Sequence, residues 1–302
     1  GATNGWIPIE DDTVTDAPYK GNTEGIFGFG DSGSYVGMTN LVSSSGVVAA
    51  DVTAVGTARR ALAATEYGGD KGIFGFGKTP DTSVVSMTNL VSNAGVVATD
   101  VTGVGTAREQ LGACEYGGDK GIFGFGTTGS DVSMTNLVSS SGVVATDVTG
   151  VGTARADLAA CEYGDDKGIF GFGWAAGLTG MTNLVSNAGV VATDVTAVGT
   201  LRTSLAACGY GYDKGIFGYG STGSYVSMTN LVSNAGVVAT DVTGVGTARR
   251  YLAATEYGYD KGIFGFGYDA SGNLSMTNLV SNAGVVATDV TGVGTARNHL
   301  GA

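Results

Sequence analysis

One unit of about 47 residues occurs six times in this chain, and that repetition restricts the possible folds more than any other feature. The motif GIFGFG or GIFGYG begins at Gly25, Gly72, Gly121, Gly168, Gly215 and Gly262. Each copy continues through a variable loop into MTNLVS, then GVVATDVT or GVVAADVT, then VGT, an Arg, and LAA or LGA. A fixed period of this length indicates an array of similar units that bury their apolar faces against one another.

Within one unit, the composition predicts four short strands. In the second copy these segments are 59–68, 71–77, 86–92 and 95–102, each rich in β-branched, aromatic or small residues and bounded by Gly or Asn. The links between them are short enough for hairpins. Alternation in the second segment places Ile73 and Gly75 on one face and both Phe side chains on the other.

Apolar residues on both faces of the MTNLVS segment predict sheets that are each packed between two others. Six such sheets of four strands, arranged radially, are typical of a β-propeller. We therefore expect an all-β, six-bladed β-propeller with four antiparallel strands in each blade of about 47 residues. Two tandem β-trefoils and a β-solenoid remain as alternatives.

The two ends of the repeat array are complementary. The chain enters its first unit at the GIFGFG segment and finishes with RNHLGA, Arg297 to Ala302, which is an isolated first segment. We expect this C-terminal strand to complete the first blade, because an open ring would leave exposed strand edges. The domain prediction is an N-terminal arm or linker over 1–22 and the propeller over 23–302.

The order of an Arg, a small-residue strand, an aromatic strand ending in Gly, and two outer strands resembles the kelch repeat. The resemblance covers about residues 24–302. The usual Gly pair is replaced by FGFG, and the spaced Tyr and Trp are absent. The resemblance implies that the small-residue strand is innermost. The near-identical copies also resemble propeller repeats in bacterial and phage tail-type proteins. A virion or an extracellular surface is the location that this second resemblance implies.

A phosphate-loop motif in the second copy has no nucleotide-binding context. GIFGFGKT, Gly72 to Thr79, satisfies G-x-x-x-x-G-K-[ST], but the other five copies carry different residues at the Lys-Thr position. A phosphate loop also leads into a helix, whereas Pro80 and a β-branched stretch follow here. We interpret the match as accidental and expect no cofactor.

Several polar residues recur once per unit. Each guanidinium of the repeated Arg has five donors, which favours a role in joining adjacent blades and leaves an anion site as the alternative. These residues are Arg59, Arg108, Arg155, Arg202, Arg249 and Arg297. The equivalent Cys114, Cys161 and Cys208 are interpreted as buried space-fillers with free thiols. No metal site is predicted, and the single His gives no repeated catalytic set, so we predict that the protein is not an enzyme.

Variation between copies is the main indication of function. It is concentrated in the loop after GIFGFG and in the two residues after each repeated Arg, which are RA, EQ, AD, TS, RY and NH. In an up-and-down sheet both zones reach the same rim, and loops on a rigid scaffold commonly carry binding sites. The candidate binding residues are the six repeated Arg and the aromatic anchors of this rim, Tyr35, Trp174, Tyr225, Tyr251 and Tyr268.

The net charge of −12 argues against a nucleic-acid partner, and no apolar run is long enough to span a bilayer. We expect a non-enzymatic binding or structural scaffold that presents variable loops to a protein or a glycan, within a larger chain or a surface or tail-type assembly. The alternative function is a lectin with one sugar site in each blade.

Overall fold

A computed structural model describes residues 22–53, 55–196 and 198–302. Over these ranges the protein is all-β, with seventeen strands and no helix. Accordingly, this part of the chain has no apolar helix of the length that a bilayer requires. The N-terminal arm expected over 1–22 lies outside the described residues, apart from Asn22.

The strands form six small antiparallel sheets, which we number along the chain. Sheet 1 contains β1 (Gly25–Asp31) and β2 (Tyr35–Val42). Sheet 2 contains β3 (Ala63–Tyr67), β4 (Lys71–Gly75) and β5 (Thr88–Val91). Sheet 3 contains β6 (Gly112–Tyr116), β7 (Lys120–Gly124) and β8 (Thr135–Val138). Sheet 4 contains β9 (Ala159–Tyr163), β10 (Lys167–Gly171) and β11 (Thr182–Val185). Sheet 5 contains β12 (Ala206–Tyr210), β13 (Lys214–Gly218) and β14 (Thr229–Val232). Sheet 6 contains β15 (Ala253–Tyr257), β16 (Lys261–Asp269) and β17 (Gly272–Val280).

The expected outermost strand is present only as an irregular segment beside the last strand of each sheet. In sheet 2, isolated bridges join Thr88 to Val101 and Val91 to Val97. Between these bridges β5 advances three residues and the outer segment four, so the outer segment carries an extra residue, as in a β-bulge. The same pair of bridges recurs beside β2, β8, β11, β14 and β17. The sheets therefore have three regular strands, or two in sheet 1, instead of the four expected.

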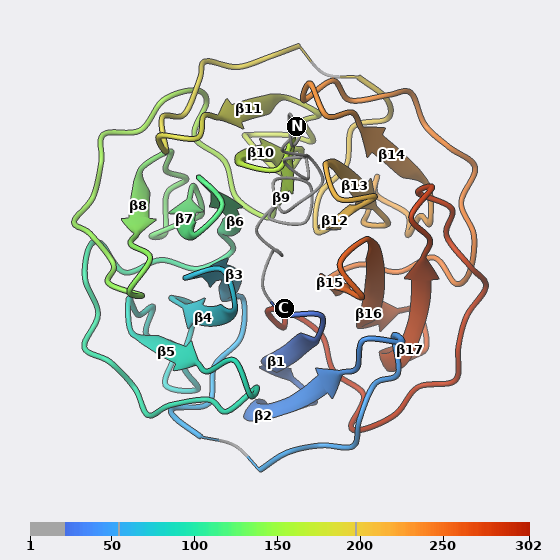
Figure 1. The fold of residues 1–302 in the computed structure, drawn as a ribbon, viewed down its shortest axis with the longest axis horizontal. Coiled ribbons are helices and arrows are strands. Elements are labelled where there is room, and N and C mark those ends of the chain that lie inside the picture. The colour runs from blue at the N-terminus through green and yellow to red at the C-terminus, as the bar shows by residue number, and fades with distance from the viewer. Residues whose placement is uncertain (1–21, 54, 197) are drawn as a thin grey trace, which may run out of the picture.

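The C-terminal segment pairs with the first strand of the chain. Gly28 and Gly301 exchange two backbone hydrogen bonds of 2.9 and 3.0 Å, and Asp31 and Asn298 exchange two of 2.8 and 3.0 Å. In Figure 1 the C-terminus lies beside β1, near the centre of the molecule. The tail thus occupies, on sheet 1, the position that β3 occupies on sheet 2.

The six sheets surround a central axis, with β3, β6, β9, β12 and β15 nearest to it (Figure 1). Six apolar clusters fill the spaces between consecutive sheets, and each cluster takes residues from two of them. One cluster joins sheet 6 to sheet 1 through Phe266, Phe27 and Leu300. No sheet in the described ranges therefore ends the row, because the last packs against the first.

Each second strand buries aromatic rings on both faces, through a local reversal of the backbone. Phe76 follows β4 with φ of 64°, in the left-handed region, and the equivalent residue in every sheet does the same. Phe74 consequently packs against Phe29 of sheet 1, and Phe76 against Phe123 of sheet 3, at 5.2 and 5.1 Å between ring centroids. The expectation that the two rings share one face was wrong. Burial of a Phe side chain, worth about 1.5–3 kcal/mol, offsets the cost of this backbone conformation, about 1–2 kcal/mol.

Close packing of these rings requires glycine at the end of the strand. A Cβ atom at Gly171 would lie 2.7 Å from Cζ of Phe217 in the next sheet, and the other five sheets have the same contact. Since Phe217 is completely buried, its ring has little room to move. The conserved spacing of Gly and Phe within the repeat thus sets the distance between neighbouring sheets.

We predict that Gly171→Ala destabilises the protein by about 1–3 kcal/mol or more, because it overpacks the space between sheets 4 and 5. Gly177→Ala is the matched control, since no heavy atom lies within 4 Å of the added Cβ. Its effect should stay within about 0.5 kcal/mol. Urea unfolding of both variants measures the difference, and equal stabilities would contradict the packing argument.

Candidate functional site

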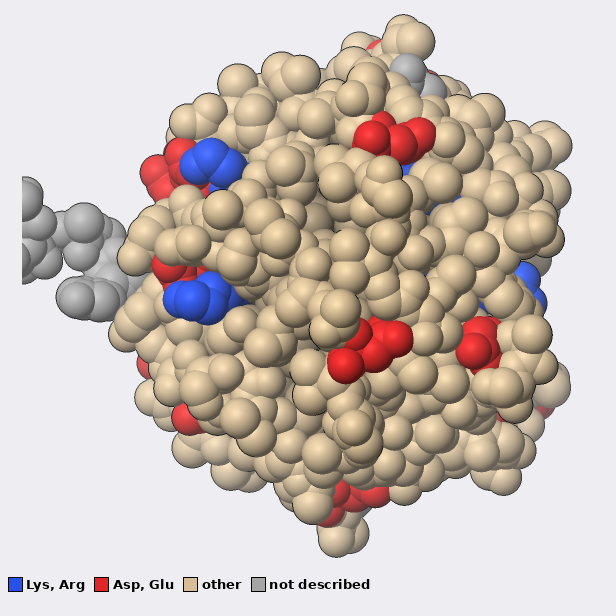
Figure 2. Space-filling view, turned by 90° about the vertical axis from the view of Figure 1, so that its right-hand side faces the viewer, with Lys and Arg blue, Asp and Glu red and all other residues tan. Residues whose placement is uncertain are grey.

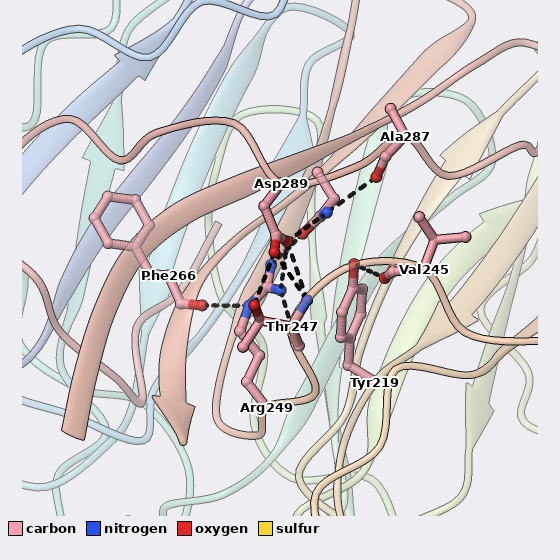
Figure 3. A network of polar contacts seen from close by, with 8 residues as sticks. Tyr219, Val245, Thr247, Arg249, Phe266, Ala287 and Asp289 are labelled. Carbon is pink, nitrogen blue, oxygen red and sulfur yellow. Dashed lines mark hydrogen bonds and ion pairs between the residues drawn. The ribbon is translucent and has the colours of Figure 1, made fainter. Parts of the chain in front are cut away.

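A buried network of polar groups surrounds each repeated Arg, and Figure 3 shows the network in sheet 6. Arg249 donates from Nε to the Phe266 carbonyl at 2.8 Å and from Nη1 to the Thr247 carbonyl at 3.1 Å. Thr247 in turn donates its N–H and its hydroxyl to the Asp289 carboxylate, at 3.0 and 2.8 Å. The guanidinium lies 4.3 Å from the ring centroid of Tyr219 in sheet 5. One Arg therefore joins the crossing segment, its own sheet and the preceding sheet.

The Arg Nε and Nη1 bonds and the Thr–Asp bonds of this network occur in all six units, including the one that joins the two ends of the chain. A further bond from Nη2 to an Asn side chain is made by Arg59, Arg249 and Arg297, whereas Nη2 of the other three Arg is buried without a partner. At the junction of the two ends, Thr295 donates to Asp51, and Arg297 donates to the Phe29 carbonyl at 2.9 Å and to Asn40 Oδ1 at 2.6 Å. These partners are separated by more than 240 residues in the sequence. Residues 295–297 are thus held to sheet 1 by the contacts that hold the other crossing segments to their sheets.

All six repeated Arg side chains have zero exposure: Arg59, Arg108, Arg155, Arg202, Arg249 and Arg297. Burial lowers the pKa of Arg59 to about 10, against the opposing effect of Asp100, so the guanidinium remains charged at neutral pH. A cation covered in this way needs its charge and donors satisfied within the protein. Each of these Arg side chains therefore joins its own sheet to the preceding one, and none presents a group to solvent.

The two variable zones of the sequence lie side by side. The residue that follows each GIFGFG pairs with the first residue after the repeated Arg of the same unit, as Lys78 does with Arg60. Side chains also meet between neighbouring units: Arg60 pairs with Asp31 at 2.9 Å, and Lys78 with Glu109 at 3.2 Å. The sign of the charge is reversed from one pair to the next. Part of the variation between copies therefore consists of matched pairs, each specific to one junction.

The rim aromatic residues are brought together only in part. The Arg250 guanidinium lies 4.6 Å from the ring of Tyr251 and 5.4 Å from that of Tyr225, and Tyr225 contacts Tyr268 edge to face at 6.5 Å. These residues come from sheets 5 and 6. Tyr35 lies elsewhere on the rim, with Arg60 at 4.8 Å from its ring. Trp174 is 47% exposed and is in neither group.

The second residue after each repeated Arg forms a closed ring around the axis, which the sequence analysis did not anticipate. Each of these residues donates its N–H to the carbonyl of its counterpart in the preceding unit, at 2.8–3.0 Å. The sixth bond runs from Ala61 to His299 and closes the circle. All six have φ between 52° and 58°: Ala61, Gln110, Asp157, Ser204, Tyr251 and His299. The only indication of this ring in the sequence was the variation of the two residues after each repeated Arg, RA, EQ, AD, TS, RY and NH. A sequence pattern does not reveal left-handed φ at residues other than Gly.

The six side chains of this axial ring are all different and line a cavity of about 120 Å³ on the axis. Burial raises the pKa of Asp157 to about 7; Glu109 and Asp131 add to this, and Arg250 and Gln110 oppose it. Burial, together with Arg60 and Arg250, lowers the pKa of His299 to about 3, so its ring is neutral. The His299 ring stacks on Tyr251 at 3.6 Å. The cavity thus carries hydroxyl, amide, carboxyl and aromatic groups around one axis.

The other end of the axis has a cavity of about 130 Å³ lined by the repeated Cys and Glu residues. Cys114, Cys161 and Cys208 are buried free thiols, and burial raises their pKa values. Glu256 reaches into the space beside Gly209. Across the described ranges, no three His, Cys, Asp or Glu residues are placed to hold a metal ion together. Lys78 of the phosphate-loop motif pairs with Glu109 and is followed by a turn, not by a helix.

The face in Figure 2 shows few charged side chains, scattered over a surface that is mostly uncharged.

Comparison of the sequence with known proteins finds no matching family model and no match among curated proteins.

Acid should weaken the repeated network. Burial tends to raise the pKa of Asp100, but hydrogen bonds from Thr57 and Asn89 and the charge of Arg59 lower it overall. A carboxyl with a lowered folded pKa contributes stability above its unfolded pKa of about 3.9, and this contribution is lost as pH falls through the folded value.

We therefore predict that Asp100→Asn reduces the free energy of unfolding at pH 6 by about 1–3 kcal/mol, and by less at pH 3, which lies below the unfolded pKa. Asp131→Asn is the control, because burial raises the pKa of that carboxyl. Denaturant unfolding at the two pH values gives the comparison. A loss for Asp100→Asn that is the same at both would contradict the assigned role.

Proposed function

We propose that the chain is a six-bladed β-propeller and that the irregular outer segment acts as the fourth strand of each blade. In this proposal, the C-terminal segment completes the first blade. Support comes from the six apolar clusters between consecutive sheets and from the pairing of Gly301 with Gly28. The position of the small-residue strands next to the axis agrees with the kelch-like order of segments.

We further propose that this propeller is a non-enzymatic scaffold that presents variable residues on one rim. The observation that carries this proposal is the contrast between framework and rim. The buried network and the Phe contacts repeat in all six units, whereas the axial ring has six different side chains. The partner is a protein or a glycan, and the setting is a surface or tail-type assembly. Nucleic acid is disfavoured by the net charge of −12.

A non-enzymatic role is consistent with the state of the groups on this rim. His299 is neutral, with its pKa lowered to about 3. A catalytic base works best with a pKa near the working pH. Its ring also contacts Asn298 and stacks on Tyr251. Arg60, Asp31, Lys78 and Glu109 are engaged in ion pairs.

The alternative, a lectin with one site per blade, requires equivalent side chains in every unit. At the position of Trp174 the other units carry Asp31, Lys78, Thr127, Ser221 and Tyr268. The rim therefore has no repeated aromatic platform at this position.

A variant with a uniform rim tests the scaffold. The loop after GIFGFG in all six units is replaced by residues 221–226, and the two residues after each repeated Arg by Thr203 and Ser204. The proposal predicts a far-UV circular dichroism spectrum like that of the parent. The melting temperature should change by only a few degrees, because the repeated Arg network and the Phe contacts between sheets are unchanged.

Failure of the uniform-rim protein to fold would contradict the proposal, because it would show that the variable residues are needed for the stability of the ring. The parent protein is the reference, because its unit 5 already carries these residues. Intermediate variants with one altered unit at a time locate any junction that the matched ion pairs stabilise.

A further inference from the structure

The cavity at the axial ring has a shape that suits a small ligand. Its volume of about 120 Å³ is roughly ten times the 10–15 Å³ that one water molecule needs by this measure. It is lined by the axial ring and by the residues that follow it at the start of the inner strands. The ring peptide groups hydrogen-bond to one another, so recognition of a ligand falls mainly to the side chains.

One of these side chains is a buried hydroxyl without a partner. Ser204 is 5% exposed, lines the cavity, and its Oγ makes no hydrogen bond. Buried polar atoms are nearly always paired in folded proteins, so an unpaired hydroxyl at a cavity wall indicates a site for a polar ligand atom. The Nε atom of Arg250, from the neighbouring unit, is also buried and unpaired.

The chemistry of the cavity wall is mixed. Gln110, Asp157 and Ser204 are consecutive members of the axial ring and offer an amide, a carboxyl and a hydroxyl. The next two members, Tyr251 and His299, are stacked on each other and form an aromatic side of the cavity. A wall that is polar on one side and aromatic on the other is typical of small-molecule sites.

The charges near the cavity favour an uncharged ligand. Besides the effect of burial, the acidic Glu109 and Asp131 raise the pKa of Asp157 and Arg250 lowers it. Arg60 and Arg250 both lower the pKa of His299. Because both signs are present, neither a simple anion nor a simple cation is selected. Adjacent hydroxyl groups of a sugar each donate and accept hydrogen bonds, and they match neighbouring amide, carboxyl and hydroxyl groups.

We propose that the axial cavity binds one neutral sugar residue per chain, through hydrogen bonds from its hydroxyl groups to Gln110, Asp157 and Ser204. In this complex the Ser204 hydroxyl gains the hydrogen-bond partner that it lacks in the free protein. This inference rests on the proposed scaffold function and gives the variable rim a ligand class. It differs from a lectin with one site per blade, because the six units contribute to a single site.

Isothermal titration calorimetry of the full chain tests the proposal, with the methyl α-glycosides of glucose, mannose, galactose and N-acetylglucosamine as probes. We expect at least one probe to bind with a stoichiometry of one. Ser204→Ala and Asp157→Ala should each weaken binding about tenfold, the effect of losing one good hydrogen bond. Both variants should fold, because Ala61 already occupies the same ring with φ of 53°.

Trp174→Ala is the control, since this exposed rim residue is not part of the cavity wall. Its affinity should equal that of the parent. The proposal is overturned if no glycoside binds at about 20 mM, a concentration that detects very weak affinity. It is also overturned by a stoichiometry of six, or by equal losses in Trp174→Ala and Ser204→Ala. None of these results alters the stability of the uniform-rim variant, which tests the scaffold separately.

Discussion

A circle of six backbone hydrogen bonds around the axis is the constraint on which the rest of the structure depends. Each unit contributes one residue with left-handed φ, and the N–H of this residue donates to the carbonyl of its counterpart in the preceding unit. The bond from Ala61 to His299 is possible only if the C-terminal segment returns to sheet 1. Once the circle closes, every sheet has two neighbours, and both of its apolar faces are covered. Near-identical units are suited to this arrangement, because every junction can then use the same contacts.

The space between the sheets shows how few contacts the repeat needs. A glycine leaves room for the Phe ring of the next sheet. A Phe with left-handed φ places a second ring on the opposite face of the strand. The guanidinium of a buried Arg packs over that second ring. The Arg would be costly to bury alone, so its Nε and Nη1 donors are directed to backbone carbonyl oxygens. Because these framework contacts repeat in every unit while the rim residues differ, the packing between sheets does not depend on any one rim side chain. Variation can then accumulate at the axial ring, where six different side chains meet at one cavity.

The sequence was sufficient to predict an all-β fold, the division into six units and the pairing of the C-terminal segment with the first strand, because repeats and strand patterns are local and regular. It was misleading where the backbone leaves regular geometry. Alternation put Phe74 and Phe76 on one face, but the left-handed φ of Phe76 separates them. The sequence of the outer segment is typical of a strand, yet its extra residue leaves only two β-bridges to the neighbouring strand. The axial ring could not be predicted, since Ser204 and His299 have no feature in common except their place in the repeat.

Amide hydrogen exchange at the axial ring tests the closed circle most directly. The Ala61 amide donates to His299 and the His299 amide donates to Tyr251, so both bonds depend on the C-terminal segment, whereas the amides of Ser204 and Tyr251 donate to residues that precede this segment. A closed ring predicts similar protection for all four amides, within about tenfold, because opening at any junction exposes the same core. Exchange at Ala61 and His299 that is faster by several orders of magnitude would contradict the account and would show that the C-terminal segment does not close the ring.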